Sequence, residues 1–198
     1  MVDILVLYCS QDGSVHKLAQ QVARGVNSVN GAEAKLRSVP NIKQPKNNLF
    51  APEIKLSEIE ECDGLALGSP THFGNMSGAM KNFIDELTPL WFKGSLESKV
   101  GTVFTSSHSL HGGNEATLLS MQIPLQHLGM LIMGIPYSIK ELNTTKDGGT
   151  PYGASHVGDQ AVTAVEEKIA YAQGKRLAEL TIKLRSWSLG SIFYLTSP

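Results

Sequence analysis

Hydrophobic positions along the chain follow two periods in alternation. Continuous or nearly continuous apolar runs predict buried strands over 4–8, 65–68, 100–105 and 130–133. Alternating apolar and polar residues predict an edge strand over 32–39. Apolar residues three and four positions apart predict helices over 15–26, 56–62, 79–87, 115–128 and 163–185. Strands that alternate with helices predict an α/β fold with a doubly wound parallel sheet of five strands, order 2-1-3-4-5, and helices on both faces.

The ends and interruptions of these elements carry further predictions. Ser57 is expected to cap the short helix over 56–62. Pro124 falls inside the helix over 115–128, where proline costs about 3 kcal/mol unless the helix kinks or ends there. The segments 40–55 and 136–157 show little periodicity and are predicted to be loops. A loop as long as 136–157 is usually functional or disordered.

The stretch 65–78 joins a buried strand to a helix and carries the clearest sign of a site. Ser69-Pro70 is expected to end the strand, because proline cannot donate a ladder hydrogen bond. The loop 69–77 that follows contains His72 and Phe73 among turn-forming residues. Ligands of open α/β sheets bind at this edge. A simple connecting loop is the alternative, and the exposed-looking Phe73 weighs against it.

Composition and charge narrow the class of protein. The 198 residues suggest one domain, and 17 basic residues nearly balance 18 acidic ones, so no global field favours nucleic acid. Cys9 and Cys62 form no CxxC pair, which fits a reducing compartment without a disulfide framework or zinc site. Neither a signal peptide nor an apolar run of membrane-spanning length is recognisable. The sequence therefore predicts a cytoplasmic protein with no membrane or nucleic-acid partner.

The domain boundary is expected near the end of the last helix. Residues 1–186 contain all the predicted elements and form the expected α/β domain. The segment 187–198 carries no charge and several large apolar side chains. Its role is open, with disorder and a contact between subunits as the two alternatives.

Parallel strands place the strand-to-helix loops at one edge of the sheet, where they wall one cleft. These loops are 9–14, 69–77, 106–114 and 136–157. In the first loop, Ser10, Ser14 and the N–H groups around Gly13 precede a helix and suit an anion, although an ordinary N-cap turn is an equal alternative. The chain contains neither Gly-x-Gly nor Gly-Lys-Ser/Thr, so the usual dinucleotide and Walker signatures are missing. A phosphate site without either signature fits a mononucleotide such as FMN.

Several motifs resemble those of WrbA-type NAD(P)H:quinone oxidoreductases, a flavodoxin-like family. Residues 4–15 are similar to the phosphate loop of flavodoxin-like proteins. The segment Gly68-Ser69-Pro70-Thr71-His72-Phe73-Gly74-Asn75-Met76-Ser77 is similar to the family's G-[ST]-P-T-R-F-G-N-M motif. Further matches extend the resemblance over residues 3 to about 185, at Leu90-Trp91, 108–115, His127-Leu128-Gly129-Met130 and Gly148 to Ala154. The P-T-x-F-G-N-M and G-G-T-P-Y-G-A matches are the specific ones.

The resemblance implies bound FMN, a homotetramer, and two-electron reduction of quinones by NADH or NADPH. It implies that the FMN phosphate is bound by Ser10, Gln11, Asp12, Gly13, Ser14 and Val15. It implies that the isoalloxazine is bordered by Pro70, Thr71, His72, Phe73, Gly74 and Asn75. The other edge of the flavin would be covered by Ser106, Ser107, His108, Ser109, Leu110, Gly112 and Gly113.

The resemblance also suggests residues for catalysis and substrate binding. His127 would lie near the ring, and His72 and His127 are the catalytic candidates. Hydride transfer leaves negative charge toward N1 and the C2 carbonyl of a flavin, and either imidazole or the backbone of 71–75 would stabilise it. Trp91 would face the substrate pocket and reach a neighbouring subunit's site, and Asp12 would border the same pocket.

Two residues depart from the family's pattern. Asp12 stands where the family usually has an aromatic residue near the dinucleotide, and an acidic group there disfavours a pyrophosphate. His72 stands where the family often has Arg, so a fixed cation is replaced by one that titrates near neutral pH. Donor affinity and pH dependence are therefore in question, more than the flavin site.

The histidines and Trp91 also have simpler interpretations. His127 suits the end of a helix, where it interacts with carbonyl groups, and Trp91 suits a core or an interface. His108 and His111 have no carboxylate or Cys at ligand spacing, so no metal site is expected. Two more histidines are expected to be solvated surface residues, His16 and His156.

Three classes of function are compatible with an FMN site of this kind. The favoured class is an FMN-dependent NAD(P)H:quinone oxidoreductase. A flavodoxin-type one-electron carrier is the alternative, but such carriers tend to be strongly acidic and this chain has a net charge of −1. An FMN-containing interaction protein is the third class, and no residue supports it.

Overall fold

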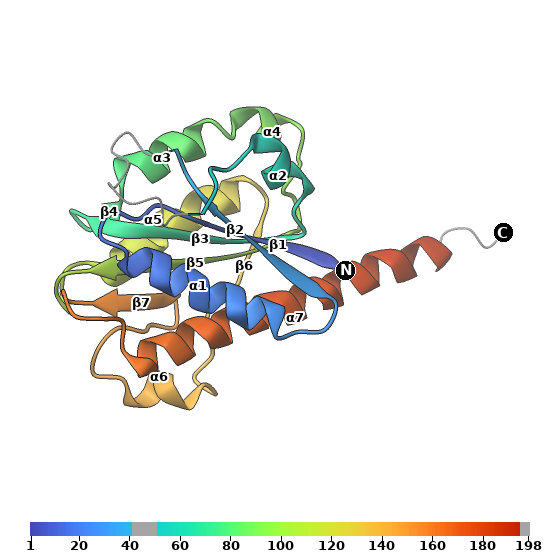
Figure 1. The fold of residues 1–198 in the computed structure, drawn as a ribbon. Helices are drawn as coiled ribbons and strands as arrows, with labels where there is room; N and C mark the ends of the chain where they lie inside the picture. Colours follow the sequence, from blue (N-terminus) through green and yellow to red (C-terminus); the bar gives the residue numbers. More distant parts are fainter. Residues whose placement is uncertain (41–50, 195–198) are drawn as a thin grey trace.

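A parallel sheet runs through the middle of the molecule in the order β2-β1-β3-β5-β6 (Figure 1). The computed structural model describes residues 1–40 and 51–194, with side chains up to Trp187. The strands of this path are β1 (Val2–Tyr8), β2 (Ala32–Ser38), β3 (Gly64–His72), β5 (Val100–Ser107) and β6 (Leu131–Ile132). The flavodoxin-like α/β class and the expected order are confirmed, with β5 and β6 in the fourth and fifth places. Parts of the predicted loop 40–55 and of the tail lie outside the described residues, at 41–50 and 195–198.

Two short strands share the position beside β5. β6 pairs with Val100 and Gly101, and β7 (Ala154–Val157) pairs in parallel with the other end of β5, at 104–107. The prediction of a continuous loop over 136–157 is therefore wrong, because this segment contains both β7 and a short helix, α6 (Lys140–Thr144). β7 has only four residues and buries a serine and a histidine, so neither an apolar run nor alternation marks it in the sequence.

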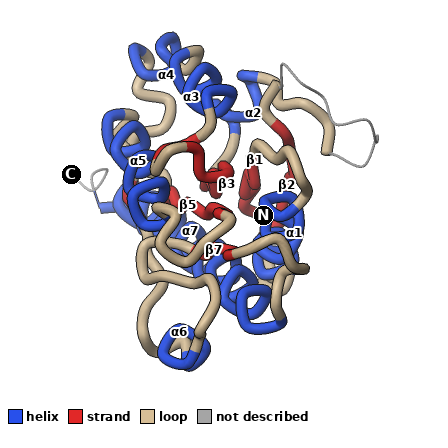
Figure 2. Tube along the Cα trace, turned by 90° about the vertical axis from the view of Figure 1, so that its left-hand side faces the viewer, coloured by secondary structure: helices blue, strands red, loops and turns tan. Residues whose placement is uncertain are grey.

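Helices cover both faces of the sheet (Figure 2). One face carries α1 (Ser14–Asn27), α6 and α7 (Ala164–Tyr194). The other face carries α2 (Leu56–Glu61), α3 (Gly78–Asp85), α4 (Thr88–Phe92) and α5 (Asn114–His127). β1 supplies both cores in alternation, with Ile4, Val6 and Tyr8 in one and Leu5 and Leu7 in the other. The predicted apolar stripes of α1 and α3 face these cores and are buried as expected.

α1 and α7 lie against each other through glycine. A Cβ on Gly25 would be 2.0 Å from the Tyr171 carbonyl oxygen, and one on Gly174 would be 2.0 Å from that of Val22. The two helix backbones therefore approach more closely than any side chain would allow. This contact fixes α1, whose N-terminus lies at the carboxyl edge of the sheet, on the long helix α7.

Two predicted helix boundaries differ from the observed ones, and the expected interruption at Pro124 is resolved. Lys55, not Ser57, is the N-cap of α2, because the Glu58 carboxylate accepts the Lys55 N–H (3.1 Å), which places the cap two residues earlier. Pro124 stays inside α5, in its last turn. α7 continues past 185 to Tyr194 and projects beyond the sheet, so the tail that begins at 187 starts within a helix (Figure 1).

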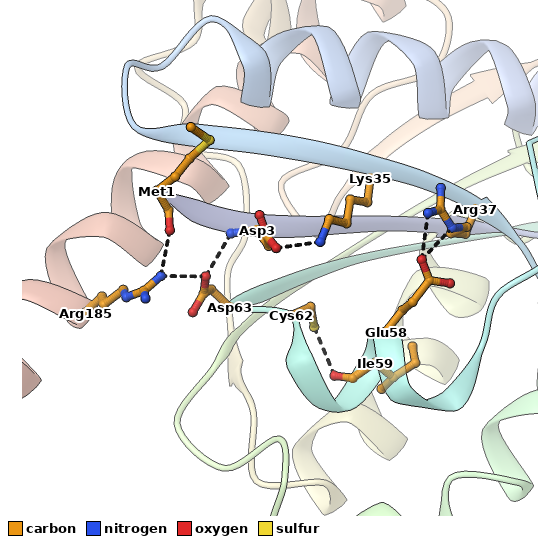
Figure 3. Close-up of polar contacts among 9 residues, drawn as sticks. All are labelled: Met1, Asp3, Lys35, Arg37, Glu58, Ile59, Cys62, Asp63 and Arg185. Atoms are coloured by element: carbon orange, nitrogen blue, oxygen red, sulfur yellow. Dashed lines mark hydrogen bonds and ion pairs between the residues drawn. The ribbon is translucent and has the colours of Figure 1, made fainter.

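The amino edge of the sheet is tied together by charged side chains (Figure 3). Arg185 Nη1 donates to the Met1 carbonyl and to Asp63 Oδ2, both at 2.8 Å. Asp63 in turn accepts the Asp3 N–H, and Asp3 pairs with Lys35 at 2.5 Å. These contacts connect α7, β1, β2 and the residue that precedes β3 at the edge opposite the loops described next. No helix in the described part of the chain is long and apolar enough to cross a membrane.

Candidate active site

The loops at the carboxyl edge of the sheet enclose one cavity of about 300 Å³. Its wall is formed by Ser10, Gln11, Asp12, Ser14, Val15, Pro70, Thr71, His72, Ser106, Ser107, His108, Gly158 and Asp159. All but the last two are among the cofactor-binding residues expected from the sequence. The cavity lies where β1 and β3 are neighbours, which is the switch point of this strand order.

The first loop leads into α1 without a side-chain cap. Gly13 is the N-cap residue with φ +95°, and its N–H donates to Ser10 Oγ (3.2 Å). Among the described residues, no side chain bonds to the first N–H groups of α1. A Cβ on Gly13 would meet no atom within 4 Å, so space is open beside the turn. A helix N-terminus with free N–H groups and open space fits a phosphate group.

β3 does not end at Ser69-Pro70, as expected, but continues to His72. Its pairing with β1 stops at Gly68, so the missing N–H of Pro70 breaks no ladder bond on that side. β3 then turns back into β4 (Asn75–Met76), with His72 opposite Asn75. The predicted loop 69–77 is therefore largely a β-hairpin, which places Pro70, Thr71 and His72 on a strand at the cavity wall.

The tip of this hairpin is the strained pair Phe73-Gly74. Both residues have positive φ, 54° and 73°, as a two-residue type I′ turn requires. Such a conformation costs a non-glycine residue on the order of 1–3 kcal/mol and is typical of functional positions. The Phe73 side chain is fully exposed at the tip, and neither turn residue is among those that line the cavity.

The third wall comes from the end of β5 and the loop that follows it. Ser107 Oγ donates to the Ser109 carbonyl (2.8 Å), which folds the loop back over the strand. His108 Nδ1 is hydrogen-bonded to Oδ1 of Asp159, from the loop after β7. Leu110 is exposed in the same loop, and Gly112 and Gly113 close it before α5. The contact between His108 and Asp159 links two loops that are far apart in the sequence.

Gly158 and Asp159 are the wall residues that sequence reasoning missed. They directly follow β7, so overlooking this strand also concealed the loop behind it. The signal was available, because Gly158-Asp159 is a turn-forming pair placed between an apolar residue and the next helix, as in the other loops of this edge.

His16 and His156 are not solvated surface residues, as expected, but inward-facing ones. His156 is 1% exposed, and its Nδ1 lies 2.8 Å from Glu166 Oε2. His16 is half-buried on α1, with Nδ1 2.7 Å from the Tyr8 hydroxyl, and burial lowers its pKa. The helical or strand period alone could not reveal either partner, because each lies on another element.

His127 and Trp91 lie together, but away from the cavity wall. Both line a second, more apolar pocket of about 190 Å³ between α3, α4 and the end of α5. Trp91 is 51% exposed, and its ring packs on Phe92 at 4.9 Å between centroids. Within one chain, the catalytic candidate His127 and the expected substrate residue Trp91 therefore lie apart from His72, whereas the other expected substrate residue, Asp12, lines the same cavity as His72.

The charge of the cavity wall is carried by carboxylates and imidazoles. The described residues that line it include Asp12, Asp159, His72 and His108, and no Lys or Arg. Burial raises the pKa of the Cys9 thiol at the start of the first loop, so Cys9 stays protonated and packs as a small apolar residue. A bound anion would therefore be stabilised by N–H and hydroxyl groups, and the wall offers no thiolate nucleophile.

Comparison with known proteins places this arrangement in a family. The model of the family "NADPH-dependent FMN reductase" matches residues 2–143, which include three of the four walls of the cavity. The chain belongs to this family. A protein named NAD(P)H dehydrogenase (quinone) from Acidithiobacillus ferrooxidans is 42% identical over 93% of this chain and 99% of its own length. One of the same name from Syntrophobacter fumaroxidans is 40% identical over 91% and 98%.

Solved structures of the family's fold agree with the architecture. A WrbA-like flavodoxin from Agrobacterium tumefaciens superposes with a TM-score of 0.68 at 21% identity, over 92% of this chain and 99% of that one. A flavodoxin from the domain Archaea superposes with a TM-score of 0.65 at 19% identity, over 92% and 99%. These likenesses establish the flavodoxin-like fold. The resemblance to WrbA-type proteins noted from the motifs is confirmed by the sequence relatives.

Proposed function

We propose that the protein is an FMN-dependent oxidoreductase that reduces quinones to hydroquinones with two electrons from NADH or NADPH. The single observation that carries this proposal is the identity of about 40% over nearly the whole chain with proteins named NAD(P)H dehydrogenase (quinone). The uncapped N-terminus of α1, beside a cavity rich in N–H and hydroxyl donors, supports FMN as the cofactor.

The chain's own groups have distinct roles in this proposal. Ser10, Ser14 and the N–H groups at the start of α1 bind the phosphate, which the dipole of a fourteen-residue helix favours. The hairpin 69–76 and the loop 106–113 would hold the ring system through their cavity-lining residues. When bound, FMN supplies the chemistry, accepting a hydride and passing two electrons to a quinone.

His72 is the side chain best placed to respond to charge at the cavity. It lies on β3 at the cavity wall, next to the strained turn. An imidazolium there stabilises the negative charge that hydride transfer leaves on a flavin, while a neutral imidazole can do so only as a hydrogen-bond donor. The fixed positive charge that arginine would supply is absent from the described wall, so this stabilisation would depend on the imidazole of His72.

A homotetramer is part of the proposal, because Trp91 and His127 do not meet the cavity within one chain. They line a pocket bordered by exposed apolar side chains, with Phe92 78% and Ile123 58% exposed. Exposed apolar surface of this kind marks interfaces in proteins of this size. Closed symmetry would repeat one shared site for every subunit. The dependence on NADH or NADPH would place the reaction in the cytoplasm.

A flavodoxin-type electron carrier remains the alternative function, and the balanced charge of the chain argues against it. Anaerobic titration of the FMN-loaded protein with NADH separates the two. We expect the flavin spectrum to pass directly from the oxidised to the two-electron-reduced form, and benzoquinone to restore the oxidised spectrum. Accumulation of a one-electron-reduced flavin without quinone turnover would favour the carrier.

The phosphate assignment has its own test. FMN should bind far more tightly than riboflavin, which lacks the phosphate, and Gly13→Val should remove most of this difference because valine is strained at φ +95°. Equal affinity for FMN and riboflavin in the native protein would show that the α1 terminus does not bind the phosphate.

A further inference from the structure

A buried ion pair lies directly behind the fourth wall of the cavity. Glu166, in the first turn of α7, is fully buried, and its carboxylate accepts four hydrogen bonds. Oε1 accepts the N–H of Gly148 (2.9 Å) and of Val157 (3.1 Å), and Oε2 accepts the N–H of Thr163 (2.8 Å). The fourth donor is His156 Nδ1 on β7, at 2.8 Å from Oε2. One carboxylate therefore connects the segment before β7, the end of β7 and the start of α7.

The surroundings of His156 favour its protonated form. Its Nε2 is buried, and among the described residues no atom stands in hydrogen-bond geometry to it. The hydrogen bond to Glu166 raises the pKa of the ring against the opposing effect of burial, and the backbone carbonyls of Gly158 and Gln160 raise it further. A neutral ring that donates from Nδ1 would turn the lone pair of Nε2 toward these carbonyls, whereas an imidazolium turns an N–H toward them.

The β7–α7 loop, residues 158–163, is held at both ends by this pair. Thr163 and Val157 donate to Glu166, while the carbonyls of Gly158 and Gln160 face His156. The same loop lines the cavity with Gly158 and Asp159. The Gly158 N–H donates to the Ser107 carbonyl (2.8 Å), and Asp159 pairs with His108. Displacement of the loop would therefore open the wall between β5 and β7.

We propose that His156 and Glu166 are positioning residues, and that the proton on His156 keeps the β7–α7 loop closed against FMN. This inference rests on the proposed FMN site. Loss of that proton leaves Glu166 as a buried carboxylate without its cation and turns a lone pair toward the loop carbonyls. The loop then loosens, and FMN affinity falls as pH rises.

Other charged groups near His156 do not replace Glu166. β5 places the uncharged Ser106 beside His156 in register, and the segment before β7 contributes the Gly148 N–H. Asp159 and His108 are exposed, line the cavity and pair with each other. They form the competing source of pH dependence, so the experiment must separate His156 from His108.

The experiment measures the dissociation constant of FMN from the full-length protein between pH 7 and 9, by flavin fluorescence. This range lies above the second ionisation of a phosphate monoester, near about 6, so the ligand keeps its charge. We expect the native constant to rise by about tenfold across the range. His156→Gln, which cannot titrate, should bind weakly at every pH with a flat profile, and His108→Asn should keep the native slope.

Each other outcome identifies a different failure. A native constant that does not change with pH overturns the inference even if His156→Gln fails to fold. A slope that persists in His156→Gln and disappears in His108→Asn assigns the effect to the surface pair and also overturns it. No FMN binding at any pH in the native protein overturns the proposed function itself, and this inference with it.

Discussion

Gly113 touches Gly74, so that the loop after β5 rests on the tip of the β3–β4 hairpin. A Cβ on Gly113 would lie only 2.8 Å from Gly74 Cα, and both residues have positive φ, +98° and +73°. The contact joins two walls of the cavity without any side chain between them. The close approach of these loops therefore depends on glycine at position 113.

Gly113→Ala is expected to lower the free energy of unfolding by about 2–3 kcal/mol, from backbone strain together with the clash. FMN should also bind more weakly, because the two loops must separate. Gly31→Ala is the matched control, since Gly31 has φ +88° but its Cβ would meet only Ile182 at 3.8 Å. Urea unfolding and FMN titration of both variants measure the difference. Equal losses in the two variants would show that the contact with Gly74 contributes nothing.

Gly68 and Phe104 form a second close pair, inside the sheet. They are partners in the register of β3 and β5, and a Cβ on Gly68 would lie 2.1 Å from Phe104 Cε2. Phe104 is fully buried, so its ring has no free space to move into. We expect Gly68→Ala to cost about 2–3 kcal/mol of unfolding free energy by overpacking.

A double-mutant cycle tests this explanation. Phe104→Leu alone should destabilise by leaving a cavity, but in the Gly68→Ala background it makes room for the new methyl group. The double variant should therefore be more stable than the sum of the two single losses predicts. Simple additivity in urea unfolding would mean that the ring and the methyl group do not compete for one space.

The parts of the fold predictable from sequence are those with a local period. β1 is an unbroken apolar run, and the stripe of α3 at Met80, Phe83 and Ile84 is buried as the helical period requires. The first loop and the segment 70–72 were found because turn residues and a specific motif occur within a few positions of each other. These two segments hold eight of the thirteen residues of the cavity wall, and three more, at 106–108, were named through the resemblance to the family.

The parts that could not be predicted depend on partners from distant elements. Gln173 of α7 accepts the Ala154 N–H and donates to Thr102, so it fixes the start of β7 through contacts that no pattern in 154–157 encodes. A polar residue such as His156 is expected at the surface from the sequence. It is buried here in a contact with the Glu166 carboxylate of α7. β3 can continue past Pro70 because its neighbour β1 has already ended at Tyr8. This relation between two strands is visible only in the assembled sheet.

The His156–Glu166 pair also predicts how stability changes with pH. The hydrogen bond between His156 and Glu166 raises the pKa of His156 above the ordinary 6.5. This contribution to stability is complete below about 6.5 and is lost as pH rises through the higher folded value. Burial alone would raise the pKa of Glu166, but the hydrogen bonds from His156, Thr163 and Gly148 outweigh it and lower that pKa below 4.5. The Glu166 contribution is therefore complete above 4.5 and is lost as pH falls through the lower folded value.

The native protein should thus lose stability between pH 6.5 and 9 relative to His156→Asn. One proton of difference between the folded and unfolded states changes the unfolding free energy by at most about 1.4 kcal/mol per pH unit. Urea unfolding at several pH values gives the two slopes. Parallel profiles for the native protein and the variant would contradict the raised pKa of His156, whatever the result for FMN binding.

The last prediction concerns Trp91, which lines the pocket with His127, and its neighbour Phe92, which does not. We expect light scattering to give a mass four times the 21.4 kDa of one chain, because both exposed rings need a covering surface. Trp91→Ala should lower quinone turnover at least tenfold with little change in FMN affinity, since Trp91 lies outside the cavity wall of its own chain.

Phe92→Ala is the matched control for Trp91→Ala, because it removes a similar exposed ring from the same helix. It should weaken the tetramer without lowering turnover at concentrations where the tetramer persists. A fully active monomer at micromolar concentration would exclude a shared site, and equal turnover losses in the two variants would assign the effect of Trp91 to assembly alone.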